Sequence, residues 1–156
     1  MMIEIVKANK SNLLEVLYII RECSRQLIEK GVKYWNNSLA DSFEISTDIE
    51  SGYIYLIKYN YVPVGTITLR FLSENESLQL ERLAIFPAYQ KKGLGQKLIE
   101  FAKETAREKG VKKILGSIPV DDADLIHLLE QNNFVKKGES IPVEISPIAV
   151  ELELLQ

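Results

Sequence analysis

The chain has 156 residues, of which 46% are hydrophobic and 26% charged, and its formal net charge is −3 at pH 7. This size and composition predict a single folded domain over residues 1–156 and exclude an intrinsically disordered chain. No apolar run reaches the roughly 20 residues of a membrane span, no signal peptide is recognised, and the negative charge excludes a general attraction to nucleic acid. Because the lone cysteine, Cys23, cannot close a disulfide within the chain, we expect a cytoplasmic protein.

Strand and helix patterns succeed one another along the amino-terminal half. Apolar residues recur at helical spacing from Leu13 to Leu27, with Ser11 as the expected N-cap and Gly31 as the stop signal. Residues 36–42 show no clear element, and Ser46 is the expected cap of a short second helix. The predicted elements are a strand at 3–7, helices at 13–27 and 46–49, and strands at 53–59 and 64–71.

The carboxyl-terminal half continues the alternation. The predicted elements are strands at 78–86 and 113–118, helices at 96–109 and 123–131, and closing strands at 134–137 and 148–154. The resulting order of strands and helices predicts an α/β domain with a mixed, twisted sheet and helices on both faces.

The loop between the strand at 78–86 and the helix at 96–109 is the most informative segment. Residues 90–95 read Gln-Lys-Lys-Gly-Leu-Gly. The first N–H groups of a helix have no internal partner and carry partial positive charge, so a glycine-containing turn at this place predicts a phosphate site. Gly93 and Gly95 would let the backbone approach a phosphate closely, and Lys91 and Lys92 add positive charge.

Two common phosphate loops do not match this segment. A P-loop requires G-x-x-x-x-G-K-[ST], and Gly93 is not followed by that pattern. A dinucleotide fingerprint requires G-x-G-x-x-G, and Leu98 stands at its third glycine.

The pattern R/Q-x-x-G-x-G/A is filled completely by Gln90, Gly93 and Gly95, and with the preceding run from Leu83 to Gln90 it resembles the acyl-coenzyme A signature of the GNAT family of N-acetyltransferases. The resemblance extends from about Ile3 to about Glu151. It implies a GNAT-like, mostly antiparallel sheet, acetyl-CoA as co-substrate, no metal, and direct attack by an amine in a ternary complex. It also allows a homodimer.

The resemblance assigns roles to particular positions. It implies that Leu83, Ala84 and Ile85 hold the pantetheine arm through their backbone, and that Asp122 lies near that arm. Tyr34 and Trp35 fall where the family lines its acceptor pocket, although core packing explains them equally well. The residues implied for the pyrophosphate are Gln90, Lys91, Lys92, Gly93, Leu94, Gly95 and Gln96.

Glu81 is the candidate general base that would take the proton from the attacking ammonium. Strand alternation predicts that it shares a face with Gln79, Leu83 and Ile85, and that this face looks toward the cofactor arm. The alternatives are a salt bridge with a neighbouring arginine or lysine, or an amine that arrives already deprotonated and needs no base.

One position departs from the family pattern. When the segment 125–134 is aligned on Phe134, Leu129 stands where the family commonly has a tyrosine that protonates the leaving thiolate, and Asn133 stands at a usual glycine. The thiolate could leave unprotonated, another hydroxyl could serve, or catalysis could be weak or absent. Asparagine tolerates positive φ better than most residues, so Asn133 is an acceptable replacement.

Three functional hypotheses follow. The first is an acetyl-CoA-dependent N-acetyltransferase, and the second is a non-catalytic acyl-CoA-binding sensor or regulatory module, which Leu129 favours. The third is a nucleotide-binding domain that recognises NAD or ATP. The acceptor, a small-molecule or peptide amine, cannot be identified from the sequence.

The single histidine, His127, is expected on an exposed helix face, and no cluster has the spacing of metal ligands.

Overall fold

The computed structural model describes residues 2–31, 41–118, 123–137 and 148–153. Its strands are β1 (Ile3–Lys7), β2 (Ile54–Tyr59), β3 (Val62–Leu72), β4 (Ser77–Ile85), β5 (Lys113–Ile118), β6 (Val135–Lys137) and β7 (Ile148–Glu153). Its α-helices are α1 (Leu13–Glu29), α2 (Ser42–Glu50), α3 (Leu94–Lys109) and α4 (Ala123–Gln131). Short 3₁₀ turns lie at Lys10–Asn12, Ser73–Asn75 and Pro87–Tyr89.

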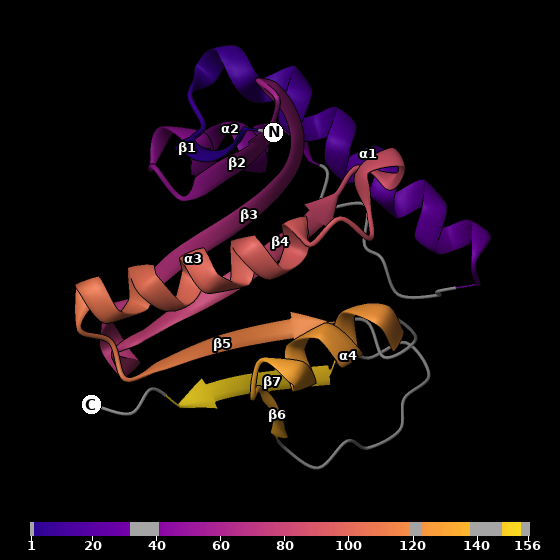
Figure 1. Cartoon of the computed structure of the whole chain (residues 1–156). Helices are drawn as coiled ribbons and strands as arrows, with labels where there is room; N and C mark the ends of the chain where they lie inside the picture. The colour runs from indigo at the N-terminus through magenta and orange to yellow at the C-terminus, as the bar shows by residue number, and fades with distance from the viewer. Residues whose placement is uncertain (1, 32–40, 119–122, 138–147, 154–156) are drawn as a thin grey trace.

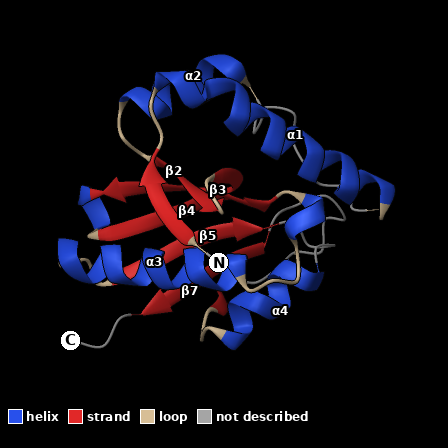
Figure 2. Cartoon of the chain, turned by 45° about the horizontal axis from the view of Figure 1, so that its top comes forward, coloured by secondary structure: helices blue, strands red, loops and turns tan. Residues whose placement is uncertain are grey.

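The strands form one sheet in the order β1-β2-β3-β4-β5-β7-β6. Every neighbouring pair is antiparallel except β4 and β5, which run parallel. Helices α1 and α2 cover one face of the sheet and α3 and α4 the other (Figures 1 and 2). The predicted fold class, a mixed and mostly antiparallel sheet with helices on both faces, is confirmed.

Two apolar clusters fill the two layers. The larger cluster lies between the sheet and α3, where Leu98, Ile99 and Ala102 are fully buried. The smaller one lies beneath α1 and α2, where Val16, Ile20 and Ile45 are fully buried. Burial of these helix faces is what stabilises helices that would be marginal alone.

Two helix starts differ from the sequence predictions, because short polar side chains upstream cap the chain earlier. Asn9, not Ser11, is the N-cap of the first helical segment: its side chain accepts from the Ser11 amide, and its own amide donates to the Asn12 side-chain oxygen. Helix α2 begins at Ser42 because the Asp41 carboxylate accepts from two amides of the first turn, at 2.9 and 3.0 Å.

Strand β4 changes partners along its length. It pairs with β5 only from Ser77 to Leu80, after which the two strands diverge (Figure 1). Against β3, Thr68 pairs with Glu81 but Thr66 pairs with Ala84, so β4 holds one extra residue at this point. This β-bulge includes Arg82, whose φ is +49°. The bulge therefore lies at the point where β4 opens away from β5.

No helix among the described residues is both long and apolar enough to span a membrane.

Candidate active site

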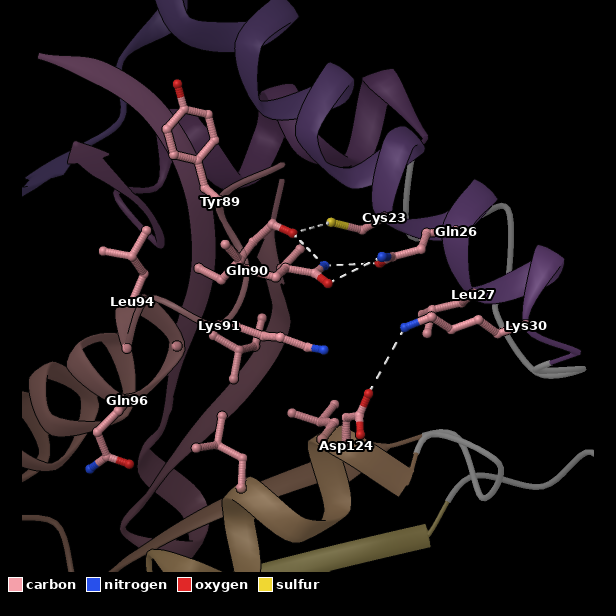
Figure 3. A pocket seen from close by; sticks show the side chains of 17 residues that line it. Cys23, Gln26, Leu27, Lys30, Tyr89, Gln90, Lys91, Leu94, Gln96 and Asp124 are labelled. Atoms are coloured by element: carbon pink, nitrogen blue, oxygen red, sulfur yellow. Dashed lines mark hydrogen bonds and ion pairs between the residues drawn. The ribbon is translucent and has the colours of Figure 1, made fainter. Parts of the chain in front are cut away.

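A cavity of about 460 Å³ lies at the carboxyl-terminal end of β4. Its walls come from α1, from the loop between β4 and α3, and from the first two turns of α4 (Figure 3). This volume is within the usual range of small-molecule sites. Leu83, Ala84 and Ile85, the residues that the resemblance implies for the pantetheine arm, line the cavity.

The backbone of Ile85 points toward the open side of the strand. The amide of Phe86 donates to the Val64 carbonyl of β3 at 2.7 Å, so the groups of Ile85, one residue earlier in an antiparallel pair, face away from β3. The carbonyl of Ile85 accepts from the Gln90 Nε2 at 2.8 Å and from the Cys23 Sγ at 3.0 Å. On this side β5 has already diverged, so the edge of β4 is accessible from the cavity.

The loop after β4 ends at the amino terminus of α3. Gly93 has a φ of +80° and is the residue before the first helical residue, Leu94. The first helical bond runs from the Lys97 amide to the Gly93 carbonyl, so the amides of Leu94, Gly95 and Gln96 precede it. These three residues line the cavity, which gives the helix terminus the geometry expected of an anion site.

The two glycines of this loop have different roles. A Cβ on Gly93 would meet no atom within 4 Å, so glycine is favoured there by its positive φ and leaves open space before the helix. A Cβ on Gly95 would lie 3.2 Å from the Leu128 Cδ2, so glycine at that position allows α4 to pack closely against α3.

The two lysines of the loop also differ. Lys91 lines the cavity and its ammonium extends between α1 and α4 (Figure 3). Lys92 is not among the described residues that line the cavity, and its ammonium lies over the Tyr59 ring, 5.9 Å from the ring centroid. From the sequence, both lysines were predicted to lie at the phosphate site.

Glu81 lies on the α1 and α2 side of the sheet. Its carboxylate accepts from the Arg70 Nε at 3.1 Å, and Arg70 also donates to Asp48 of α2 at 2.9 Å. Leu83 and Ile85 instead pack against the cluster under α3. The prediction that Glu81 shares their face is wrong, because the extra residue of the bulge reverses the alternation. Glu81 is also absent from the described residues that line the cavity.

Asp48 joins two guanidinium groups in this network. It accepts from Arg82 at 2.7 Å as well as from Arg70, and the Arg82 side chain is 5% exposed. Burial alone would raise the pKa of Asp48, but the hydrogen bonds and charges of the two arginines outweigh it and hold that pKa below its ordinary value. The hydrogen bond to Glu81 raises the pKa of Arg70, so Arg70 stays cationic.

Most of the amino-acid sequence matches one known protein family. Residues 15–134 match the sequence profile of the Acetyltransferase (GNAT) family. The chain belongs to the GNAT family of acetyltransferases.

Relatives of this GNAT protein support the assignment. An uncharacterized N-acetyltransferase of Schizosaccharomyces pombe is 32% identical over 117 residues, which cover 72% of this chain and 74% of that protein. The PaiA N-acetyltransferase of Thermoplasma acidophilum, solved with coenzyme A, superposes with a TM-score of 0.85 at 17% identity, over 99% of this chain and 100% of that one. The YncA protein of Salmonella typhimurium, solved with acetyl-CoA, superposes with a TM-score of 0.76 at 20% identity, over 100% of this chain and 96% of that one. Because the two solved structures are only 17% and 20% identical to this chain, they are evidence of a shared fold alone.

Several positions singled out from the sequence can now be placed. Leu129 is 1% exposed and packs in the core, so a proton donor is missing at that position. Asn133 has a φ of +72°, a left-handed conformation that favours glycine, so the prediction of positive φ at this position is confirmed. His127 is exposed, as expected. Tyr34, Trp35 and Asp122 lie outside the described residues.

Sequence reasoning missed the contribution of α1 to the cavity. Cys23, Gln26, Leu27 and Lys30 line it, and they follow the i, i+3, i+4, i+7 spacing of one helix face. That face mixes apolar and polar residues, a signal that it borders a site and is not only core. The described residues contain no group of three or more His, Cys, Asp or Glu side chains placed to hold a metal ion.

Proposed function

We propose that this GNAT protein transfers an acetyl group from acetyl-CoA to a primary amine, by direct attack of the amine while both molecules are bound. The observation that carries the proposal is the cavity where β4 parts from β5, because it joins an accessible strand edge to the amino terminus of a helix. An extended arm that ends in phosphates needs both features side by side.

The helix terminus would hold the pyrophosphate. The amides of Leu94, Gly95 and Gln96 and the positive end of the α3 dipole favour an anion there, and Lys91 adds a charge from the cavity wall. The open space in front of Gly93 leaves room for a bulky group. We therefore assign the phosphates to the backbone of 93–96 and to Lys91.

The opened edge of β4 would hold the pantetheine arm. The Ile85 carbonyl is already engaged by Gln90 and Cys23, so the Ile85 N–H, which also faces away from β3, would donate to a carbonyl of an extended ligand, as in a neighbouring strand. A backbone N–H at the same edge can donate to the oxygen that becomes negative when the thioester is attacked. Acetyl-CoA supplies the activated acetyl group, and the chain supplies its orientation.

Glu81 is our proposed general base, acting directly or through water. Arg70 fixes the position of its carboxylate, which ordinary alternation with Leu80 directs to the side of the sheet covered by α1 and α2. In this arrangement the amine would approach from the α1 and α2 side and the acyl donor from the cavity. The two reactants would then meet at the bulge.

A second candidate function is a non-catalytic acyl-CoA-binding module, which the burial of Leu129 favours. Tyr89 does not replace the missing hydroxyl, because its ring packs against Tyr59 and Phe86 and its hydroxyl points away from the cavity (Figure 3). Tyr89 is the one tyrosine among the described residues that line the cavity, so from those residues the enzyme hypothesis has the thiolate leave unprotonated, which a thiol pKa near ~8.5 allows.

The test has two stages. Calorimetric titration with acetyl-CoA, NAD and ATP should show binding of acetyl-CoA alone, and binding of NAD or ATP alone would overturn the assignment. A panel of primary amines with detection of released thiol then separates the two candidates. Amine-dependent thiol release supports the acetyltransferase, and tight acetyl-CoA binding with no release by any amine class supports the sensor.

A further inference from the structure

Two reciprocal pairs of side-chain amides hold the segment after β4: one ties the loop to α1, and the other ties the first turn of α3 to the residue that follows α4. In the first pair, Gln90 donates to Gln26 of α1 at 2.9 Å and accepts from it at 3.2 Å. In the second pair, Gln96 donates to Asn132 at 2.9 Å and accepts from it at 2.8 Å. We call these the α1 amide pair and the α4 amide pair. The members of each pair come from distant parts of the sequence.

The orientation of the α1 amide pair is fixed by its surroundings. The Gln90 Nε2 also donates to the Ile85 carbonyl at 2.8 Å, so this nitrogen must face β4 and cannot exchange places with the oxygen. Gln26 then has one complementary orientation. Figure 3 shows the Gln90 side chain directed at Gln26 across the top of the cavity.

The α4 amide pair is more deeply buried. Asn132 is 4% exposed and has all its hydrogen-bonding capacity in use, because it also donates to the Leu128 carbonyl at 2.8 Å and accepts from Lys103 at 3.3 Å. Gln96 uses its second N–H on Glu100 at 3.3 Å.

We propose that Gln26, Gln90, Gln96 and Asn132 are positioning residues that hold the loop in the shape that receives the phosphates of acetyl-CoA. The proposal rests on the proposed function. Both donors of Gln90 and both donors of Gln96 are engaged within the protein, so these side chains support the loop and leave the phosphates to the backbone amides and Lys91. A loop ordered before the ligand arrives loses less conformational freedom on binding.

Neutral amides suit this task. A glutamate in place of either Gln90 or Gln96 would keep the size of the side chain but would turn a donor into a second acceptor and bring negative charge to an anion site. An amide pair adds two hydrogen bonds without a charge that would compete with the bound phosphates.

The experiment compares two ligands that differ in their phosphates. Gln26→Leu and Asn132→Leu each remove one amide pair from outside the loop, and Gln131→Leu changes an exposed amide at the end of α4 as the matched control. Binding of acetyl-CoA is measured by calorimetry and binding of S-acetylpantetheine, which lacks the phosphates, by NMR titration. Circular dichroism establishes that each variant is folded.

We expect each variant to raise the Kd for acetyl-CoA about tenfold, the equivalent of one or two ordinary hydrogen bonds, and to leave the Kd for S-acetylpantetheine unchanged. The Gln131→Leu control should leave both unchanged. Equal weakening of both ligands, or no weakening of acetyl-CoA, overturns the proposal. A wild-type protein that binds neither ligand overturns the proposed function itself.

A double-mutant cycle separates positioning from direct contact. If Gln90 acts through Gln26, then Gln26→Leu, Gln90→Leu and the double variant should raise the acetyl-CoA Kd by similar factors. If the two factors multiply in the double variant, Gln90 contacts the phosphates itself and the positioning role is wrong.

Discussion

The amino-terminal half of β4, Ser77–Leu80, pairs with β3 on one side and with β5 on the other, whereas the carboxyl-terminal half pairs with β3 alone. In the first half Leu78 and Leu80 are buried in the apolar cluster under α3. In the second half the side chains divide between the ion-pair network of Asp48 and the cavity.

The difference shows where a strand stops being core and presents an edge without a strand partner. A strand paired on both sides has all its backbone groups engaged, while a strand that has lost one neighbour keeps groups for a ligand. The change occurs at Arg82, whose positive φ is unfavourable for a residue with a Cβ and persists only because the surroundings fix it. Asp48 and Thr68 provide that fixation through hydrogen bonds to the guanidinium.

Asp48→Ala should have the largest effect, because it removes the carboxylate between two guanidinium groups. Arg82 would remain buried without its counter-charge, and its Nε already finds no partner among the described residues. We expect the free energy of unfolding to fall by about 3–5 kcal/mol, measured by urea denaturation. A loss below about 1 kcal/mol would show that water reaches Arg82 and that the bulge does not depend on Asp48.

Leu78→Ala is the matched substitution at the other end of the strand. Leu78 is fully buried, so we expect a loss of about 2–5 kcal/mol from the cavity it leaves. Under conditions where both variants are folded, Asp48→Ala should weaken acetyl-CoA binding and Leu78→Ala should not. Equal affinities would contradict the division of β4 into a packing half and a binding half.

Gly93→Asp tests the loop that follows the opened half. A carboxylate at this place would stand before the helix terminus, and like charges about 4 Å apart near a protein surface repel by about 4 kcal/mol, or about a thousandfold in Kd. Gly110→Asp is the control, since Gly110 also has a positive φ and open space but lies at the opposite end of α3. Calorimetry should detect acetyl-CoA binding in the control only, and binding by both variants would remove the loop from the site.

Glu81→Gln tests the proposed base. We expect kcat to fall about 100-fold near neutral pH, with the loss shrinking at high pH, where the amine arrives deprotonated. Glu76→Gln, which changes an exposed carboxylate just before β4, should leave the rate unchanged. A loss that is independent of pH would assign Glu81 to the ion-pair network and not to proton transfer.

The smallest expected effect concerns acid stability. Because the pKa of Asp48 in the folded chain lies below its ordinary value of 3.8, its contribution to stability is complete above that value and is lost as the pH falls through the folded pKa. The difference in unfolding free energy between wild type and Asp48→Asn should therefore be constant above about pH 5 and shrink below it. A difference that grows on acidification would reverse the sign of the interaction.

Much of this architecture could be predicted from the sequence, because the signals were local. The apolar spacing on α1 and α3 and the glycines of the loop reflect geometry within one element. Asn133 could be recognised as a glycine substitute once the segment was aligned on Phe134, because asparagine tolerates positive φ.

The errors had a different origin. No local residue type marks a left-handed Arg82, because that conformation is imposed by Asp48, 34 residues away. The face of Glu81 was therefore assigned wrongly. The α1 amide pair joins residues that are 64 positions apart in the sequence. Nothing in the residue type of either glutamine distinguishes it from an ordinary surface residue.

The opened edge of β4 also bears on how long the folded protein survives. An unpaired strand edge at the rim of a sheet can pair with another chain and lead to aggregation. Here the unpaired edge lies inside the sheet and is bordered by α1 and α4. A ligand that paired along it, as we propose, would stabilise the folded form by mass action, by about 2.7 kcal/mol at a hundredfold excess over Kd. Proteolysis in the cell would then follow the supply of that ligand, and the abundance of this protein would rise and fall with it.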